Sequence, residues 1–275
     1  MSCENENYHL GDKNRYWTKI LFTGFVIYVA SIISLVLTSN IHLFPTVVLI
    51  GNFLVPVSFV AFFYERRNKF SLNMPSTALS FFYGGVLGTI TAALLEPVFI
   101  SSLTLRSAFT VGIIEEFTKL IGVLIISRCR RHDSQIDGIV LGAAAGMGFA
   151  AFESTGYAFN TFLQSGGSLS HTVLITLIRG LASPVGHGTW TAILSSVLFR
   201  ESAKGRFILN GSVIGAYAAV VLLHGLWDAV PFLVNFNLPL MHSVISGQLF
   251  IGAVSILLLM KHWRQAKMKS SFSFL

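Results

Sequence analysis

Charged residues are scarce in this sequence. Only 11% of its 275 residues are Asp, Glu, Lys or Arg, and 53% are hydrophobic, whereas soluble domains carry about 25% charged residues. The mean hydropathy is +0.69. This composition excludes a water-soluble globular protein and predicts an integral membrane protein with the bilayer as its solvent. No polar stretch is long enough for a separate soluble domain, so a single membrane domain over residues 1–275 is expected.

Cysteine and local targeting or zinc motifs are also scarce. Cys3 and Cys129 are the only cysteines, and both fall on the predicted cytoplasmic side, which favours free thiols over a disulfide. The first apolar run is too long for a cleavable signal peptide and lacks a small-residue cleavage site. The zinc-binding pattern His-Glu-x-x-His is absent, so no local motif supports a metal site.

Long apolar runs dominate what is present. Each is close to the roughly 20 residues that a helix needs to cross the hydrocarbon core. They predict an all-α bundle of about eight transmembrane helices, at residues 17–38, 44–64, 78–100, 107–126, 136–160, 171–198, 207–234 and 242–260.

The basic residues fall on alternate connections between these spans. Sixteen of the 19 Lys and Arg residues lie before or at the start of the first span, after the second, fourth and sixth spans, or after the last. Because basic loops stay inside, both termini are expected in the cytoplasm, and the plasma membrane is the expected location. The net charge of +7 is then a topology signal, and no nucleic-acid partner is expected.

Ionisable side chains nevertheless occur inside the predicted spans. An unpaired charge at the bilayer centre costs about 2.5–3.5 kcal/mol on the lenient insertion scale, so seven would cost roughly 20 kcal/mol. The pattern therefore predicts a polar site, reached by water, among the fourth to seventh spans. The seven residues are Glu96, Glu115, Glu116, Lys119, Glu153, Arg179 and Asp228, with His187 and His224 at similar depth.

The fourth and fifth spans carry paired polar residues at helical spacing. Glu115 and Lys119 are four residues apart and share a helix face, whereas Glu116 is turned by about 100°. The lysine is therefore expected to hold one glutamate while the other faces elsewhere; a simple self-neutralising pair explains only one of them. Glu153 and Tyr157 also share a face, so the tyrosine hydroxyl could orient the carboxylate. Nearby glycines (Gly142, Gly146 and Gly148) favour close helix packing.

The sixth and seventh spans supply the histidines. The stretch Ser183-Pro-Val-Gly-His-Gly predicts a break in the sixth helix at mid-membrane, beside His187. His224 and Asp228 are again four residues apart, so the carboxylate could fix the imidazole tautomer or share a metal with it.

Charge counting points to a bound cation or to protonated carboxylates. Five intramembrane carboxylates face only two cations, a deficit of three positive charges, although Glu96 at the outer end of its span is expected to be peripheral. Histidine with glutamate is a plausible zinc ligand set. The candidate ligands for Zn²⁺ are His187, His224 and Glu116.

Four motifs in consecutive spans resemble the PrsW family of intramembrane proteases, within the superfamily of CAAX prenyl proteases and bacteriocin-processing proteins. They occur in the family's order within about residues 105–232, although the family often has Asn where Asp228 stands. The resemblance implies the catalytic residues Glu115, Glu116, His187 and His224, supported by Lys119, Glu153, Tyr157, Arg179 and Asp228. The motifs are Glu115-Glu116-x-x-Lys119, Phe152-Glu153-x-x-x-Tyr157, His187 after Ser-Pro, and His224-x-x-x-Asp228.

The activity that the resemblance implies is hydrolysis of a peptide bond in a membrane-anchored protein, such as an anti-sigma-factor-like substrate. Two mechanisms stay open at this stage: water activated by zinc with a glutamate as base, or water activated by Glu116 directly while a histidine or Tyr157 stabilises the oxyanion. A non-catalytic scaffold that binds transmembrane helices and a proton- or ion-coupled transporter are the alternatives. The sequence leaves the oligomeric state open.

Overall fold

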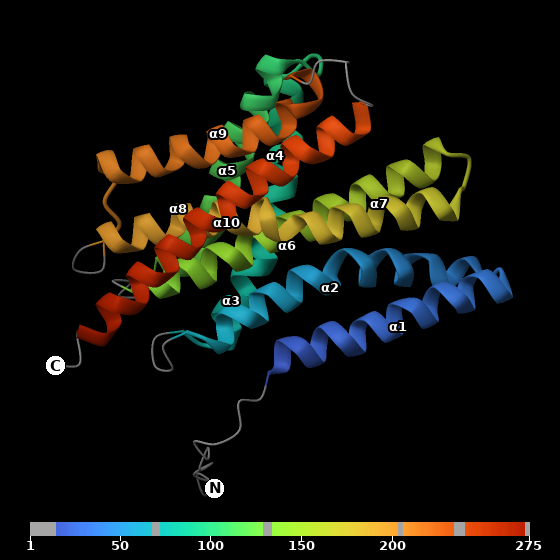
Figure 1. Ribbon diagram of the computed structural model, residues 1–275, viewed down its shortest axis with the longest axis horizontal. Helices are drawn as coiled ribbons and strands as arrows, with labels where there is room; N and C mark the ends of the chain where they lie inside the picture. Colours follow the sequence, from blue (N-terminus) through green and yellow to red (C-terminus); the bar gives the residue numbers. More distant parts are fainter. Residues whose placement is uncertain (1–14, 68–71, 129–133, 203–205, 234–239, 273–275) are drawn as a thin grey trace, which may run out of the picture.

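The computed structural model describes residues 15–67, 72–128, 134–202, 206–233 and 240–272, and every regular element in these ranges is a helix (Figure 1). The predicted all-α class is confirmed. The elements are α1 (Tyr16–Thr38), η1 (Ile41–Leu43), α2 (Phe44–Glu65), α3 (Met74–Phe82), η2 (Tyr83–Leu87), α4 (Gly88–Phe99), α5 (Leu105–Ser127), α6 (Gln135–Gln164), α7 (Leu169–Ala182), η3 (Ser183–Val185), α8 (His187–Glu201), α9 (Gly211–Leu233) and α10 (Leu240–Phe272).

Six helical segments in the described ranges are long and apolar enough to cross a membrane. α5 also has the length, but it carries Glu115, Glu116 and Lys119. The sixth predicted span is divided into α7, the short turn η3 and α8, so the break predicted at Ser183–Gly188 is confirmed. α10 continues past the predicted end at residue 260 to Phe272, because Lys, Arg, Gln and Ala there favour a helix although they end the apolar run.

α6 is the central helix of the bundle (Figure 1). In its most apolar window 94% of the residues are buried, against 11% in α1, which lies at the periphery. α2, α5 and α8 end on the left of Figure 1, where α10 also ends. This arrangement agrees with the alternation of basic connections in the sequence.

Glycines bring α6 and α8 close together, as the sequence predicts. A Cβ atom at Gly138, Gly142 or Gly146 would collide with a backbone carbonyl oxygen of α8, and at Gly146 that oxygen belongs to His187. The three glycines are four residues apart and form one face of α6. Their missing side chains therefore set the position of the α8 backbone from which His187 projects.

Replacing Gly146 with alanine should destabilise the protein. The added methyl group meets the His187 carbonyl, and such overpacking costs about 1–3 kcal/mol. Gly215→Ala is the matched control, because a Cβ there has nothing within 4 Å, and alanine in a helix interior gains about 0.5–1 kcal/mol over glycine. Thermal unfolding in detergent would measure both, and equal melting temperatures for the two variants would contradict this packing role.

Local hydrogen bonds fix the ends of the helices that carry the charged residues. α5 begins with a capping box, in which the Ser107 amide donates to Thr104 Oγ1 (3.1 Å) and the Thr104 amide donates to Ser107 Oγ (2.7 Å). At the break between α7 and α8, Ser183 Oγ donates to the Arg179 carbonyl (2.7 Å). α8 then begins with the Trp190 amide donating to the Gly186 carbonyl (3.0 Å). The chain thus turns within a few residues of His187.

Candidate metal centre

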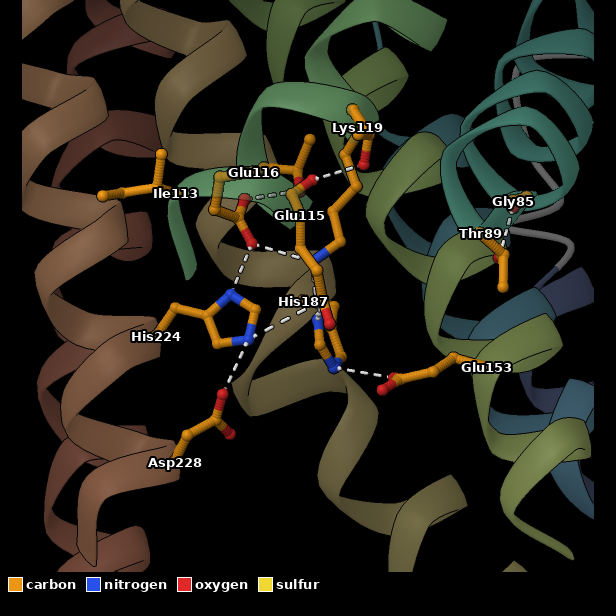
Figure 2. Close-up of polar contacts among 12 residues, drawn as sticks. Gly85, Thr89, Ile113, Glu115, Glu116, Lys119, Glu153, His187, His224 and Asp228 are labelled. Atoms are coloured by element: carbon orange, nitrogen blue, oxygen red, sulfur yellow. Dashed lines mark hydrogen bonds and ion pairs between the residues drawn. The ribbon is translucent and has the colours of Figure 1, made fainter. Parts of the chain in front are cut away.

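Four helices bring the predicted polar residues into one buried cluster (Figure 2). α5 supplies Glu115, Glu116 and Lys119. α6 supplies Glu153 and α8 supplies His187. α9 supplies His224 and Asp228. The buried members have little or no exposure to solvent: Glu115 is 4% exposed, His224 1%, and Glu116 and Lys119 0%. The cluster consists of Glu115, Glu116, Lys119, Glu153, His187, His224 and Asp228.

Lys119 lies at the centre of this cluster. Its ammonium group contacts Glu115 Oε2 at 3.0 Å, Glu116 Oε1 at 2.8 Å and His187 Nδ1 at 2.8 Å. An ammonium group has three N–H donors, so all three are satisfied. The expectation that the lysine would hold only one of the two glutamates is wrong, because its long side chain reaches between residues three and four positions away.

Each histidine directs one ring nitrogen at a carboxylate other than Glu115. His187 Nε2 lies 3.3 Å from Glu153 Oε2, and His224 Nδ1 lies 3.0 Å from Glu116 Oε1. Because Lys119 donates to His187 Nδ1, the His187 proton is assigned to Nε2. The other two nitrogens, His187 Nδ1 and His224 Nε2, each lie 3.7 Å from Glu115 Oε2. The first has a closer contact with Lys119 Nζ (2.8 Å), and the second has a closer contact with Asp228 Oδ2 (3.4 Å).

Glu115, His187 and His224 therefore form a possible metal-binding triad. One donor atom from each lies within 4.8 Å of the others. Two imidazoles and one carboxylate are a usual catalytic zinc set, and a second carboxylate on each ligating histidine is the usual outer support. The donor types fit zinc, but Lys119 Nζ contacts both His187 Nδ1 (2.8 Å) and Glu115 Oε2 (3.0 Å), so a bound zinc ion would have to replace these two lysine contacts.

This triad contains Glu115, whereas the sequence-based ligand set named Glu116. Glu116 is surrounded by donors: Lys119, His224 Nδ1, and Thr191 Oγ1 at 3.1 Å. Its carboxylate supports His224 from the side away from Glu115. The two glutamates have different partners because one turn of α5 faces both α8 and α9. Only the structure shows which of the two carboxylates lies between the histidines.

Formal charges within the cluster also leave room for a divalent cation. With neutral histidines, four carboxylates and two cations, Lys119 and the adjoining Arg179, leave a net charge of −2. The deficit of three expected from the sequence also counted Glu96, which lies outside these contacts but lines the adjoining cavity.

Arg179 supports Glu153 from α7. Its Nη2 lies 2.7 Å from Glu153 Oε2, its Nε donates to Ser154 Oγ (3.1 Å), and its guanidinium lies 3.8 Å from the centre of the Tyr157 ring. Tyr157 was expected to orient Glu153 with its hydroxyl, but the contact in the structure is between its ring and Arg179. On α9, Asp228 Oδ2 lies 3.4 Å from His224 Nε2, as their spacing predicts.

Two cavities adjoin the cluster. The larger, ≈300 Å³, is lined by residues of α4, α5 and α6 that include Glu96, Glu115, Glu153 and Gly156. The smaller, ≈190 Å³, is lined by residues that include Arg179 and His187. The prediction that Glu96 is peripheral is wrong, because α4 packs beside α5 and turns Glu96 toward the same cavity as Glu153. The larger cavity is also bounded by the third predicted span, not only by the fourth to seventh.

The larger cavity should admit water, which cysteine labelling can test. Gly156 lines it, and a Cβ there has nothing within 4 Å, so Gly156→Cys should react with a charged, membrane-impermeant thiol reagent. Gly188→Cys is the control, because its Cβ would lie 2.8 Å from Met147 Sδ in the packed interior. With Cys3 and Cys129 replaced by serine, equal protection of both positions would contradict an aqueous cavity.

Sequence reasoning missed Trp190, which packs against both histidines. Its ring stacks on His224 with centroids 4.6 Å apart and meets His187 edge-on at 5.5 Å. Its Nε1 donates to Ser255 Oγ (2.9 Å) on α10, and the side chain is fully buried. The spacing of three residues from His187 was a usable signal, but nothing in the sequence indicates the contact with Ser255.

Fold and site together define a multi-pass helical membrane protein with a buried glutamate–histidine cluster between its helices. Residues 74–260 match the family described as PrsW family intramembrane metalloprotease. This match covers more than half of the chain, and the chain belongs to that family, as the four motifs predicted. No curated protein and no solved structure matches the chain.

Proposed function

We propose that the protein hydrolyses a peptide bond of a membrane-anchored protein substrate and uses Zn²⁺ held by Glu115, His187 and His224. The observation that carries this proposal is the arrangement of the two imidazoles. Each directs one nitrogen toward Glu115 and the other toward a separate carboxylate, Glu153 or Glu116. A buried histidine pair that only joins helices has no need of three carboxylates.

The residues around the triad keep the ligands in place. Glu116 holds the His224 ring through Nδ1, and Glu153 holds the His187 ring through Nε2. Trp190 restricts both rings from a third direction. Zinc held there would supply Lewis-acid chemistry, which polarises a carbonyl and makes water more acidic.

The attacking water must reach the site and lose a proton. Glu115 and Glu153 both line the ≈300 Å³ cavity, whereas Glu116 is fully buried and lines neither cavity described above. With Glu115 as a ligand, Glu153 is the carboxylate beside the histidines that faces the cavity. We therefore assign the role of proton acceptor to Glu153 instead of Glu116, with Arg179 Nη2 and His187 Nε2 both contacting its Oε2.

The family and the basic connections support a wider proposal. The family match over residues 74–260 includes the expected core at 105–232, within one membrane domain. We propose the plasma membrane as the location, cytoplasmic termini from the basic connections, and a substrate of the anti-sigma-factor type, a membrane-anchored regulator released by cleavage. The bilayer itself is the second partner.

Comparison of new protein N-termini tests this function. Membrane vesicles from cells that produce the wild-type protein, His187→Ala or no protein would be incubated and analysed by N-terminal peptide sequencing. Cleavage within or beside a transmembrane segment that appears only with the wild type is expected. Identical N-termini in all three, with wild-type and variant proteins present at equal levels, would contradict a protease and favour a scaffold.

A further inference from the structure

A third cavity lies away from the charged cluster, between α1, α2 and α10. It is a groove of ≈550 Å³ with an almost wholly apolar lining. Pro184 of η3 closes one side of it. The other lining residues are Trp17 and Leu21 of α1, Val55, Ser58, Phe59, Phe62 and Phe63 of α2 with the adjacent Arg66, and Ile256, Leu259, Met260 and Trp263 of α10.

The groove extends over about one leaflet of a bilayer. Its α2 lining recurs every three or four residues from Val55 to Arg66, a distance of about 16 Å at 1.5 Å per residue. The hydrocarbon core of a bilayer is about 30 Å thick. The groove is therefore too short for a transmembrane helix but has the length of a single acyl chain, with one end near the membrane surface.

The surface end of the groove carries basic side chains, beside one carboxylate, Glu65, that accepts from the Trp17 amide (2.8 Å). The Arg66 guanidinium lies 3.7 Å from the centre of the Phe62 ring, and its Nη1 donates to the Phe62 carbonyl (2.9 Å). Among the described residues no carboxylate lies within 4.0 Å of Arg66. Lys267 Nζ lies beside it and donates to the Arg66 carbonyl (2.6 Å). A guanidinium fixed on an aromatic ring at the mouth of an apolar groove suits a phosphate.

We propose that this groove binds one phospholipid with an anionic headgroup. The headgroup phosphate pairs with Arg66 beside Lys267, and one acyl chain follows the aromatic face of α2 inward to Pro184. Basic pockets between transmembrane helices are a recurrent site for anionic lipids. The site uses none of the residues of the metal centre, so it stands whether or not the proposed protease function does.

Native mass spectrometry of the delipidated protein in detergent tests the proposal. Dioleoyl phosphatidylglycerol and dioleoyl phosphatidylcholine would be titrated separately and the first bound lipid quantified. The anionic lipid should bind at least tenfold more tightly. Dihexanoyl phosphatidylglycerol, which keeps the headgroup but has short chains, should bind at least tenfold more weakly than the dioleoyl form.

Neighbouring arginines provide the matched variants. Arg66→Gln should lose the preference for phosphatidylglycerol, and Arg66→Lys should keep only part of it, because lysine retains the charge but not the guanidinium stacked on Phe62. Arg67→Gln should bind as the wild type does, because Arg67 is directed at the carbonyls of Leu72 and Tyr64 outside the groove. Equal binding of the two dioleoyl lipids by the wild type, or an equal loss in Arg66→Gln and Arg67→Gln, would overturn the proposal.

Discussion

Glu115→Gln should abolish zinc binding and substrate cleavage, whereas Glu116→Gln should weaken both only partly. Glu115 is the carboxylate that shares the triad with His187 and His224, and glutamine keeps its size but not its charge. Glu116 contacts His224 from outside the triad, and loss of such an outer partner typically costs 10–100-fold in metal affinity or activity. For Glu115→Gln we expect a loss of at least about 10³-fold in cleavage, the scale of removing a principal electrostatic group.

Glu115→Gln and Glu116→Gln make the same change at adjacent positions of one helix, so each variant is the control for the other. Zinc affinity would be measured by competition with a chelator, and cleavage by the initial rate of product release in proteoliposomes that contain the substrate found by N-terminal sequencing. A Glu116→Gln protein that loses zinc while Glu115→Gln retains it would contradict the ligand assignment. It would restore the ligand set predicted from the sequence.

Lys119→Met should destabilise the metal-free protein severely and make it depend on zinc. The lysine is fully buried, and its ammonium group is the shared partner of Glu115 and Glu116. Breaking a buried ion pair by removing one partner costs about 3–5 kcal/mol, because the remaining charge is left unpaired. Methionine retains the length and flexibility of the side chain, so the loss reports the charge and not a cavity.

Thermal unfolding with a chelator and then with added zinc measures this dependence. The chelated variant should melt well below the wild type, and zinc should raise its melting temperature by more than it raises that of the wild type. Arg106→Met is the control, because Arg106 is on the first turn of the same helix but outside the cluster. A chelated Lys119→Met protein that is as stable as the wild type would contradict this role of the buried ammonium group.

Much of the site could be predicted because its residues are exceptions in an apolar background. Glu115, Lys119 and His224 stand out against runs in which charge is costly, and their spacing fixes which of them share a helix face. The break before His187 was predictable because proline and glycine occur together at mid-span. These are local properties, and the helices at residues 105–127 and 211–233 reproduce them.

The remaining details depend on how separate helices pack. A helical spacing cannot show whether Glu115 or Glu116 meets the two histidines, because that depends on the rotation of α5 against α8 and α9. Glu96 was misplaced because its role depends on α4 lying beside the cavity. Trp190 and Ser255 are ordinary residues of membrane helices, and only the contact between α8 and α10 gives them a place in the site.

The metal content of the purified protein tests the central assignment most directly. The wild-type protein and a His187→Ala/His224→Ala double variant would be purified in detergent without chelators, and bound metals would be quantified by mass spectrometry. We predict close to one zinc ion per wild-type chain and almost none in the variant. Wild-type protein without metal, or zinc retained equally by the variant, would contradict a metal centre at Glu115, His187 and His224.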